Sequence, residues 1–258
     1  MDIKKGSSWK RISAFLFDLI LFAITALIAA TLISWILKYD ANLASYQERK
    51  TAVETAYGIT FDISEEEYLS YDAEKKAAYD AAYEALNADS EAVRLYMLLN
   101  SQALLIVSFS LLFAFLVLEF AVPMLFKNGV TLGKKIFGLC VVKQSGVAVT
   151  GPVMFVRTIL GKYAVETQIP AYILIMFFFG RADLFLLILL GAILLVNVGL
   201  FLFTQNHLTL HDLIAVTAVA DYATQKIFPS EEEKAAYLAK EEEDRIRKMR
   251  EENVFSKP

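Results

Sequence analysis

The chain has 258 residues, of which 57% are hydrophobic, and its mean hydropathy is +0.47. Soluble domains average about 45–50% apolar residues, so this composition excludes an ordinary soluble domain. The formal net charge is only −4, and we expect no nucleic-acid partner. The single cysteine, Cys140, excludes an internal disulfide and any cysteine-cluster metal site.

Three apolar runs are long enough to cross a membrane. They occupy residues 12–37, which Asp18 interrupts, and residues 95–126 and 184–203. Each reaches the roughly 20 residues that a helix needs to span the hydrocarbon. Because lipid leaves no partner for free backbone groups, such runs become helices.

A third crossing, between the last two runs, is shorter. Residues 169–180 reach membrane length only if the helix begins near Ile159 and includes Lys162, Glu166 and Pro170. The segment 127–165 has six Lys or Arg residues and no acid, which favours the cytoplasm. Charge therefore predicts four crossings with both termini cytoplasmic.

Residues 38–94, between the first two spans, carry thirteen acids and six bases and should lie outside. Ser64 is a predicted N-cap, and a further helix is predicted from Asp72 to Leu86. We interpret this segment as a small helical insertion. It is either a solvated hairpin without a ligand or a vestibule that attracts cations.

After the last span, a charged helix is predicted from Pro229 to Arg250. Its apolar stripe is thin, so we expect it to float or to dock weakly on the inner membrane surface.

Two stretches that follow spans resemble each other. NGVTLGKKIFGLCVVK begins at Asn128, and NHLTLHDLIAVTAVAD begins 78 residues later, with five identities between them. At the same offset, Glu119 of the second span aligns with Asn197 of the fourth. Arg11, before the first span, corresponds to Arg157, before the third span. The pattern predicts a parallel repeat of two helices each, with a pseudo-twofold axis along the membrane normal. The alternative is chance similarity of short apolar segments.

Each stretch has the pattern of a short helix followed by a strand. Thr131 and Thr209 suit N-caps of the two helices. Residues 138–142 and 215–219 are rich in β-formers, so we expect two neighbouring strands below the membrane.

These motifs resemble a known family. Arg11, Asp18 and the stretch Leu210-His211-Asp212-Leu213-Ile214-Ala215-Val216-Thr217, together with Thr131-Leu132-Gly133-Lys134-Lys135, are similar to the RDD family of small bacterial membrane proteins. The resemblance covers residues 9–37, 96–165 and 184–221. It implies a bacterial cell-membrane location and a suggested role in transport, with sodium–proton antiport proposed for some members.

The ionisable residues inside the spans are the candidate site. Asp18 and Glu119 each lie seven residues from the cytoplasmic end of their span, so they should share a depth with Arg11 nearby. Paired carboxylates beside an arginine can bind a cation or exchange protons. The alternative is an Arg–Asp–Glu network that locks the helices together.

Supporting residues follow from the motifs. Asp212 should lie at the inner rim and pair with Lys134, Arg157 or Arg11. His207 and His211 are four residues apart, but a cap at Thr209 separates them, and no third ligand lies nearby, so no metal site is predicted. No nucleotide-binding or hydrolase motif is present, and we expect neither enzyme activity nor a cofactor.

The sequence thus predicts an all-α membrane protein, a four-helix transmembrane bundle of two parallel pseudo-repeats. Its predicted segments are 1–37 (N-terminus and first span), 38–94 (extracellular insertion), 95–126 (second span), 127–158 (cytoplasmic TLGK motif), 159–206 (third and fourth spans), 207–221 (cytoplasmic LHD motif) and 222–258 (charged helix). The first function hypothesis is transport of a small cation in exchange for protons, by a homodimer in the bilayer. The second is a scaffold or regulatory subunit that binds a protein through its insertion or tail.

Overall fold

The computed structural model describes residues 3–126, 129–179 and 184–255. Two predicted features, Asn128 and the turn at 180–183 between the third and fourth spans, lie outside the described residues. The chain divides into two compact units. The larger comprises residues 1–25 and 112–258, and the smaller comprises residues 26–111.

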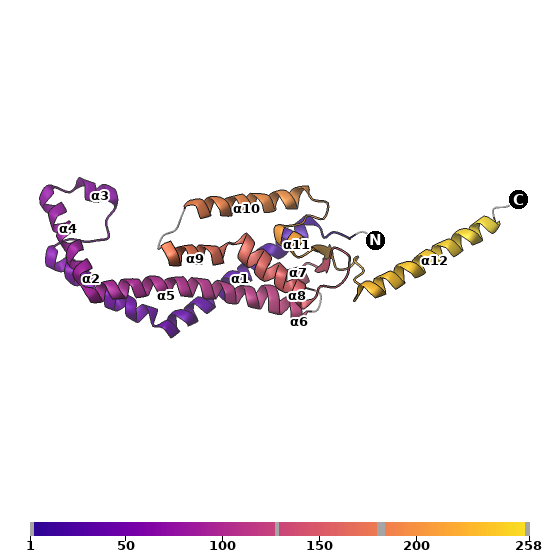
Figure 1. Cartoon of the computed structure of the whole chain (residues 1–258), viewed down its shortest axis with the longest axis horizontal. Helices are drawn as coiled ribbons and strands as arrows, with labels where there is room; N and C mark the ends of the chain where they lie inside the picture. The colour runs from indigo at the N-terminus through magenta and orange to yellow at the C-terminus, as the bar shows by residue number, and fades with distance from the viewer. Residues whose placement is uncertain (1–2, 127–128, 180–183, 256–258) are drawn as a thin grey trace. The chain divides into compact units, whose positions relative to one another are not determined.

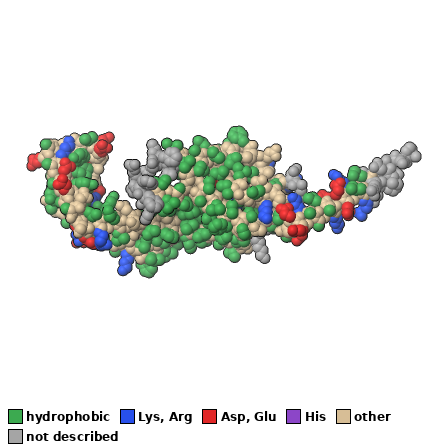
Figure 2. Space-filling view, viewed as in Figure 1, with side chains coloured by type: hydrophobic (Ala, Val, Ile, Leu, Met, Phe, Trp, Pro, Cys, Tyr) green, Lys and Arg blue, Asp and Glu red, His purple; other side chains and the backbone are tan. Residues whose placement is uncertain are grey.

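Within the described residues, two helical stretches are long and apolar enough to cross a membrane. One is α1 (Ser8–Leu37). The other runs from Ser90 to Leu125 through α5 (Ser90–Ala114), the π-helix η1 (Phe115–Ala121) and α6 (Val122–Leu125). Figure 2 shows hydrophobic side chains covering the surface of the apolar helices, while charged side chains gather on the insertion and on the C-terminal helix. This distribution fits a membrane protein.

The third helical stretch differs from the predicted continuous helix. It consists of α8 (Gly151–Phe155), the π-helix η2 (Val156–Glu166) and α9 (Ile169–Phe179). The helix breaks at Gln168, which adopts a positive φ of 53°. Pro170 explains the break, because its ring would clash with the carbonyl of Glu166 and it has no N–H to donate. The expectation of one helix from Ile159 to Gly180 is therefore wrong.

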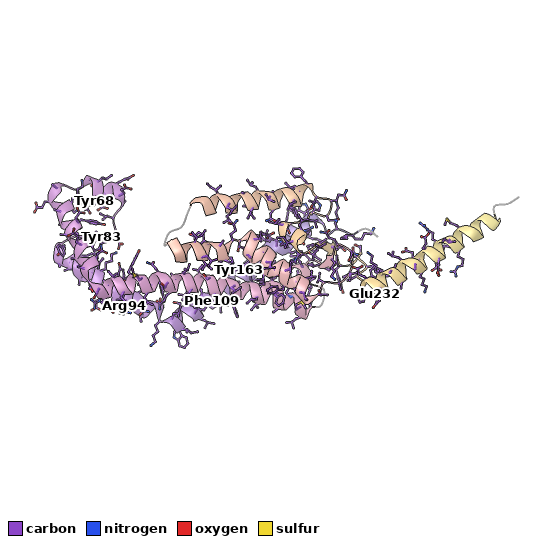
Figure 3. The ribbon with its side chains drawn as sticks, viewed as in Figure 1. Tyr68, Tyr83, Arg94, Phe109, Tyr163 and Glu232 are labelled. Carbon is purple, nitrogen blue, oxygen red and sulfur yellow. The ribbon has the colours of Figure 1, made fainter. Side chains whose placement is uncertain are left out.

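The fourth stretch, α10 (Leu184–Phe203), has 20 residues and carries one strongly polar side chain, Asn197. Aromatic rings join the helices of the larger unit. The Phe115 ring lies 4.8 Å from the Phe22 ring and 5.3 Å from the Tyr163 ring, both edge-on. Figure 3 marks Tyr163 on its helix. Such edge-to-face pairs stabilise beyond the area they bury.

Two short strands form a ribbon next to the helices. β1 (Leu139–Lys143) pairs antiparallel with β2 (Thr217–Asp221), which confirms the predicted neighbouring strands with β2 starting two residues later than expected. One face of the ribbon packs on Ala14 of α1, and the other packs on Val130. The ribbon is a buried core under α1 rather than a surface hairpin.

The structure reproduces the 78-residue offset. The short helices α7 (Leu132–Ile136) and α11 (Leu210–Ile214) begin and end at equivalent residues, as do the two strands. Positive φ angles recur at the same offset, at Gly129 and His207 and again at Gly138 and Val216. Val141 pairs with its own equivalent, Val219. A local twofold axis through that pair accounts for the register, and chance similarity does not.

The smaller unit contains the helical insertion. It comprises α2 (Tyr39–Tyr57), α3 (Glu65–Ser70) and α4 (Ala73–Ala88), which are labelled in Figure 1. Ser64 accepts a hydrogen bond from the Glu67 N–H, and Asp72 accepts one from Lys75 N–H, as the predicted caps require. The sequence interpretation did not identify α2 as a separate helix.

The charged C-terminal helix is α12 (Glu231–Phe255), which begins close to the predicted start and runs past Arg250. The Ser230 hydroxyl accepts a hydrogen bond from the Glu233 N–H, which caps its first turn.

Candidate functional site

Asp18 projects from α1 onto the N-terminus of α7. Its carboxylate accepts a hydrogen bond from the Gly133 N–H at 2.7 Å and another from the Thr131 hydroxyl. Thr131 in turn accepts from the Lys134 N–H as the N-cap. A side chain at position 133 would not fit, because a Cβ there would lie 2.4 Å from the Ala14 carbonyl oxygen and 2.9 Å from the Asp18 carboxyl group. Asp18 therefore satisfies the free donors of a helix end.

Glu166 does the same for α11 in the second half. Its carboxylate accepts from the His211 N–H at 2.9 Å and from the His211 ring nitrogen Nδ1 at 2.8 Å. His211 is the 78-residue equivalent of Gly133, so the same helix position is capped by a carboxylate in both halves. Here the close approach is made by Gly161, where a Cβ would lie 2.7 Å from the His211 Cβ.

The first helix of each half also has an equivalent in the other half, but the number of residues between matched positions is not constant. Three matched pairs lie 146, 147 and 148 residues apart: Arg11 and Arg157, Ala14 and Gly161, and Asp18 and Glu166. The second member of each pair lies in η2, whereas the first lies in the regular helix α1. A π-helical hydrogen bond closes over one more residue than an α-helical one, so a π segment absorbs the extra residues. A gapless comparison matches only the two arginines.

Asp212 is the most buried charged residue of the larger unit, with 0% of its surface exposed. It accepts hydrogen bonds from Arg157, from the Thr217 hydroxyl at 3.2 Å and from the Thr209 hydroxyl at 2.8 Å. The Arg11 guanidinium lies 3.9 Å away. Burial alone would raise the pKa of Asp212, but the Arg157 charge and these hydrogen bonds hold that pKa well below its usual range.

Of the three candidate partners of Asp212, the structure selects two, Arg157 and Arg11. Arg11 also donates to the Asn206 carbonyl at 2.9 Å. The prediction that Arg11 converges with Asp18 and Glu119 is therefore wrong for the described residues. Arg11 instead contacts the motif that contains Asp212, since the ribbon brings that motif beneath α1.

Glu119 pairs with Lys162, with 2.7 Å between carboxylate oxygen and ammonium nitrogen. These residues lie in the two π-helices, and the Thr158 hydroxyl of η2 also donates to the Glu119 carbonyl at 2.8 Å. π segments occur often at functional sites because they reposition side chains. Asn197, the sequence equivalent of Glu119, has a different role and accepts from the Leu210 N–H at 2.8 Å.

Lys134 is the equivalent, at the 78-residue offset, of Asp212 in the second half of the chain. Its ammonium lies 3.3 Å from the Thr131 hydroxyl oxygen. Burial lowers the pKa of Lys134 to about 8, against the opposing influence of Glu119 and Asp18. Among the described residues its ammonium has no carboxylate within 4 Å, unlike that of Lys162, so its charge is held less firmly.

His207 and His211 do not share a ligand. The His207 ring nitrogen Nδ1 lies 2.8 Å from the Phe201 carbonyl oxygen, while His211 contacts Glu166 and Arg157. Burial and the Arg157 charge lower the pKa of His211. The described residues contain no group of three or more side chains placed to hold a metal ion.

Sequence reasoning missed two members of the network, Glu166 and Lys162, as site residues. Both were placed in the third span merely as polar interruptions. With them, the larger unit brings together four carboxylates (Asp18, Glu119, Glu166 and Asp212) and four basic groups (Arg11, Lys134, Arg157 and Lys162). The formal charges of this network, which we call the charge network, cancel.

One family model, described as the RDD family, matches residues 5–216 of the chain. No curated protein and no solved structure matches it. The match covers most of the chain, including every residue of the charge network, so the chain belongs to the RDD family.

Proposed function

We propose that this member of the RDD family is a non-enzymatic membrane protein that exchanges a small cation for a proton at Lys134, Asp18 and Glu119. We further propose that the chain crosses the membrane four times, that both termini are cytoplasmic, and that the protein is a homodimer in the bilayer. The observation that carries it is the position of the Lys134 ammonium, which is partly buried and lies under the influence of two carboxylates from different helices.

The two pseudo-equivalent sites differ in a way that supports different roles for them. In the second half, Asp212 is held by arginines, which keep their charge at any pH that a cell experiences. In the first half the equivalent residue is Lys134, whose pKa is lowered to about 8 by burial. The first half suits exchange, and the second suits a fixed structural anchor.

Loss of the Lys134 proton would leave the network with a net negative charge. The oxygens of Asp18, Glu119 and Thr131 are hard ligands of the kind that Na⁺ and similar cations prefer. A cation that enters would restore neutrality, and reprotonation of Lys134 would expel it. The proton on Lys134 and the cation therefore compete, because either one alone makes the network neutral.

The test is thermal unfolding of the purified chain in detergent, with NaCl or with an equal concentration of N-methyl-D-glucamine chloride, at about pH 7 and about pH 9. We expect Na⁺ to raise the melting temperature more at the higher pH, where Lys134 is neutral. Lys134→Gln should remove the pH dependence of the Na⁺ effect. The matched control is Lys135→Gln, because the Lys135 ammonium lies over the Phe126 ring, 3.8 Å from its centre.

Transport itself requires flux in liposomes, with wild type compared with Asp18→Asn and Lys134→Gln. A Na⁺ response of Lys134→Gln equal to that of wild type would refute the exchange site. So would Na⁺ flux that both variants leave unchanged.

The second candidate is a purely structural role for the charge network, and the cancelling charges of the network favour it. In that case the protein is a scaffold or regulatory subunit, and the buried pairs hold its helices together. Asp18→Asn would then lower stability, while Na⁺ and N-methyl-D-glucamine would have equal effects on the melting temperature of wild type.

A further inference from the structure

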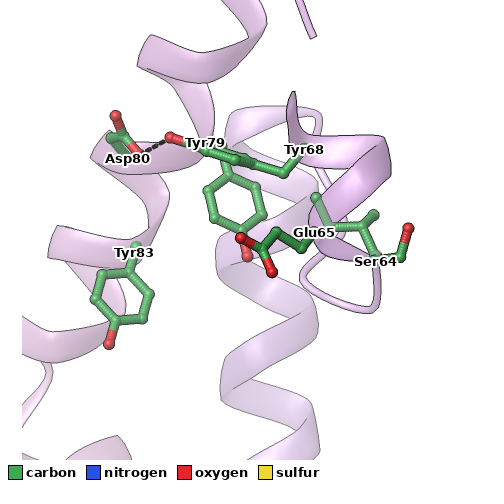
Figure 4. A pocket seen from close by; sticks show the side chains of 7 residues that line it. Ser64, Glu65, Tyr68, Tyr79, Asp80 and Tyr83 are labelled. Carbon is green, nitrogen blue, oxygen red and sulfur yellow. Dashed lines mark hydrogen bonds between the residues drawn. The ribbon is translucent and has the colours of Figure 1, made fainter. Parts of the chain in front are cut away.

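The insertion holds a surface pocket of about 320 Å³ between α3 and α4, the tyrosine pocket. The side chains that matter to the argument are Tyr68, Tyr79, Tyr83, Glu65 and Asp80. Figure 4 shows the Tyr68 hydroxyl reaching Asp80 beside the Tyr79 ring, and it labels Glu65 among the side chains that line the pocket. The volume falls at the lower end of the range for small-ligand sites.

Two of the rings are held in place by neighbours. The Tyr68 and Tyr79 rings lie 5.1 Å apart and are tilted by 58°, and the Tyr68 hydroxyl donates to Asp80 at 3.0 Å. Tyr79 also packs edge-on against Phe61 at 5.5 Å. Tyr83 is 56% exposed, so its ring is available to a ligand. Fixed rings lose little entropy when a ligand binds.

The surrounding charge favours cations. Positions 62–91 contain ten acidic and two basic residues. Both bases already lie over tyrosine rings, with the Lys75 ammonium 3.8 Å from the centre of Tyr71 and the Lys76 ammonium 5.9 Å from that of Tyr68. The faces of aromatic rings carry negative potential, so this part of the insertion attracts positive groups through its rings as well as its carboxylates.

We propose that the tyrosine pocket binds a small organic cation of the quaternary ammonium class. Aromatic faces favour cations whose charge is spread over alkyl groups, because such cations are weakly hydrated. Na⁺ holds its water more firmly, and the two carboxylates disfavour anions. The pocket lies in the smaller unit and does not depend on the exchange proposed for the charge network.

The test is titration calorimetry of the full chain in detergent with choline and with 3,3-dimethylbutan-1-ol, a neutral molecule of the same shape. We expect choline to bind at least about fivefold more tightly than the alcohol, since a cation–π contact contributes about 1 kcal/mol or more. Equal affinities, or no saturable binding of choline, would refute the proposal.

Substitutions at the exposed ring separate its aromatic face from its apolar bulk. Tyr83→Phe keeps the face and should bind choline like wild type, whereas Tyr83→Leu should weaken binding by about threefold or more. Asp80→Asn should also weaken choline binding and leave the alcohol unaffected. The matched control is Tyr57→Leu, at an exposed tyrosine of α2 outside the pocket. Equal choline affinity in Tyr83→Phe and Tyr83→Leu would contradict the proposed site.

Discussion

At the scale of single residues, the way each charge is buried decides its role. Asp212 is enclosed and meets two arginines, while Asp221 lies at the end of β2 and pairs with Lys10 at the surface. A buried carboxylate has lost its water, so its partners must replace every lost interaction. A surface pair keeps much of its hydration and contributes little.

This contrast gives a prediction for Asp212→Asn. The variant leaves Arg157 and Arg11 buried without their counter-charge, so we expect a loss of about 3–5 kcal/mol in the free energy of unfolding. Asp221→Asn should cost less than about 1 kcal/mol. Denaturant unfolding in detergent measures both. Equal losses would show that Asp212 is not held as a buried ion.

Gly133 permits the close contact between α7 and α1. Gly133→Ala should push Asp18 and the Ala14 carbonyl away and lower stability by about 1–3 kcal/mol, as overpacking does. Gly199→Ala on α10 is the control, because a Cβ there meets no atom within 4 Å. It should be neutral or slightly stabilising, since alanine favours helices. A Gly133→Ala variant as stable as Gly199→Ala would argue against the contact.

At the scale of elements, the third helical stretch is shaped by a break. Thr167 closes the end of η2 by donating its hydroxyl to the Tyr163 carbonyl at 2.5 Å, and it accepts from the Ile169 N–H. Gln168 follows with a positive φ, and both polar atoms of its buried side chain lack hydrogen-bond partners among the described residues. The break ends η2 at Glu166, whose carboxylate caps α11.

The cost of this backbone can be measured with two substitutions at one position. Gln168→Gly and Gln168→Ala both remove the unpaired amide, but only glycine adopts a positive φ without strain. We expect Gln168→Gly to be more stable than Gln168→Ala by about 1 kcal/mol in thermal or denaturant unfolding. The opposite order, which helix interiors normally show, would mean that the helix is continuous in solution.

At the scale of the whole molecule, the distribution of charge predicts the topology of the chain in the membrane. Charge asymmetry predicts that the insertion lies outside, and an even number of crossings would then put the C-terminal helix inside. The native thiol does not interfere with labelling, because Cys140 is fully buried and burial raises its pKa to about 11.

Cysteine labelling in intact cells tests this topology. Ala73→Cys in α4 should react with a membrane-impermeant maleimide from outside, and Ala235→Cys in α12 only after the cells are opened. Both positions are exposed, so burial cannot mask a reaction. Labelling at position 235 in intact cells would show an odd number of crossings.

The sequence alone determined the features that depend on local pattern. Apolar runs predicted the long helices, Ser64 and Asp72 marked helix starts, and the Thr-Leu motifs predicted paired helix–strand units at a constant offset. Each of these depends on residues within one or two turns of each other, where hydrogen-bonding needs and hydrophobic periodicity act directly.

Only the tertiary structure decided which buried charges meet. Sequence depth suggested that Asp18, Glu119 and Arg11 converge, but folding of the ribbon brings Asp212 to Arg11 and leaves Asp18 on the N-terminus of α7. The π-helix changes the spacing along one half, so Glu166 takes the place equivalent to Asp18 without a constant offset. Helix winding and strand register set these partners, and both depend on packing between segments that are far apart in the sequence.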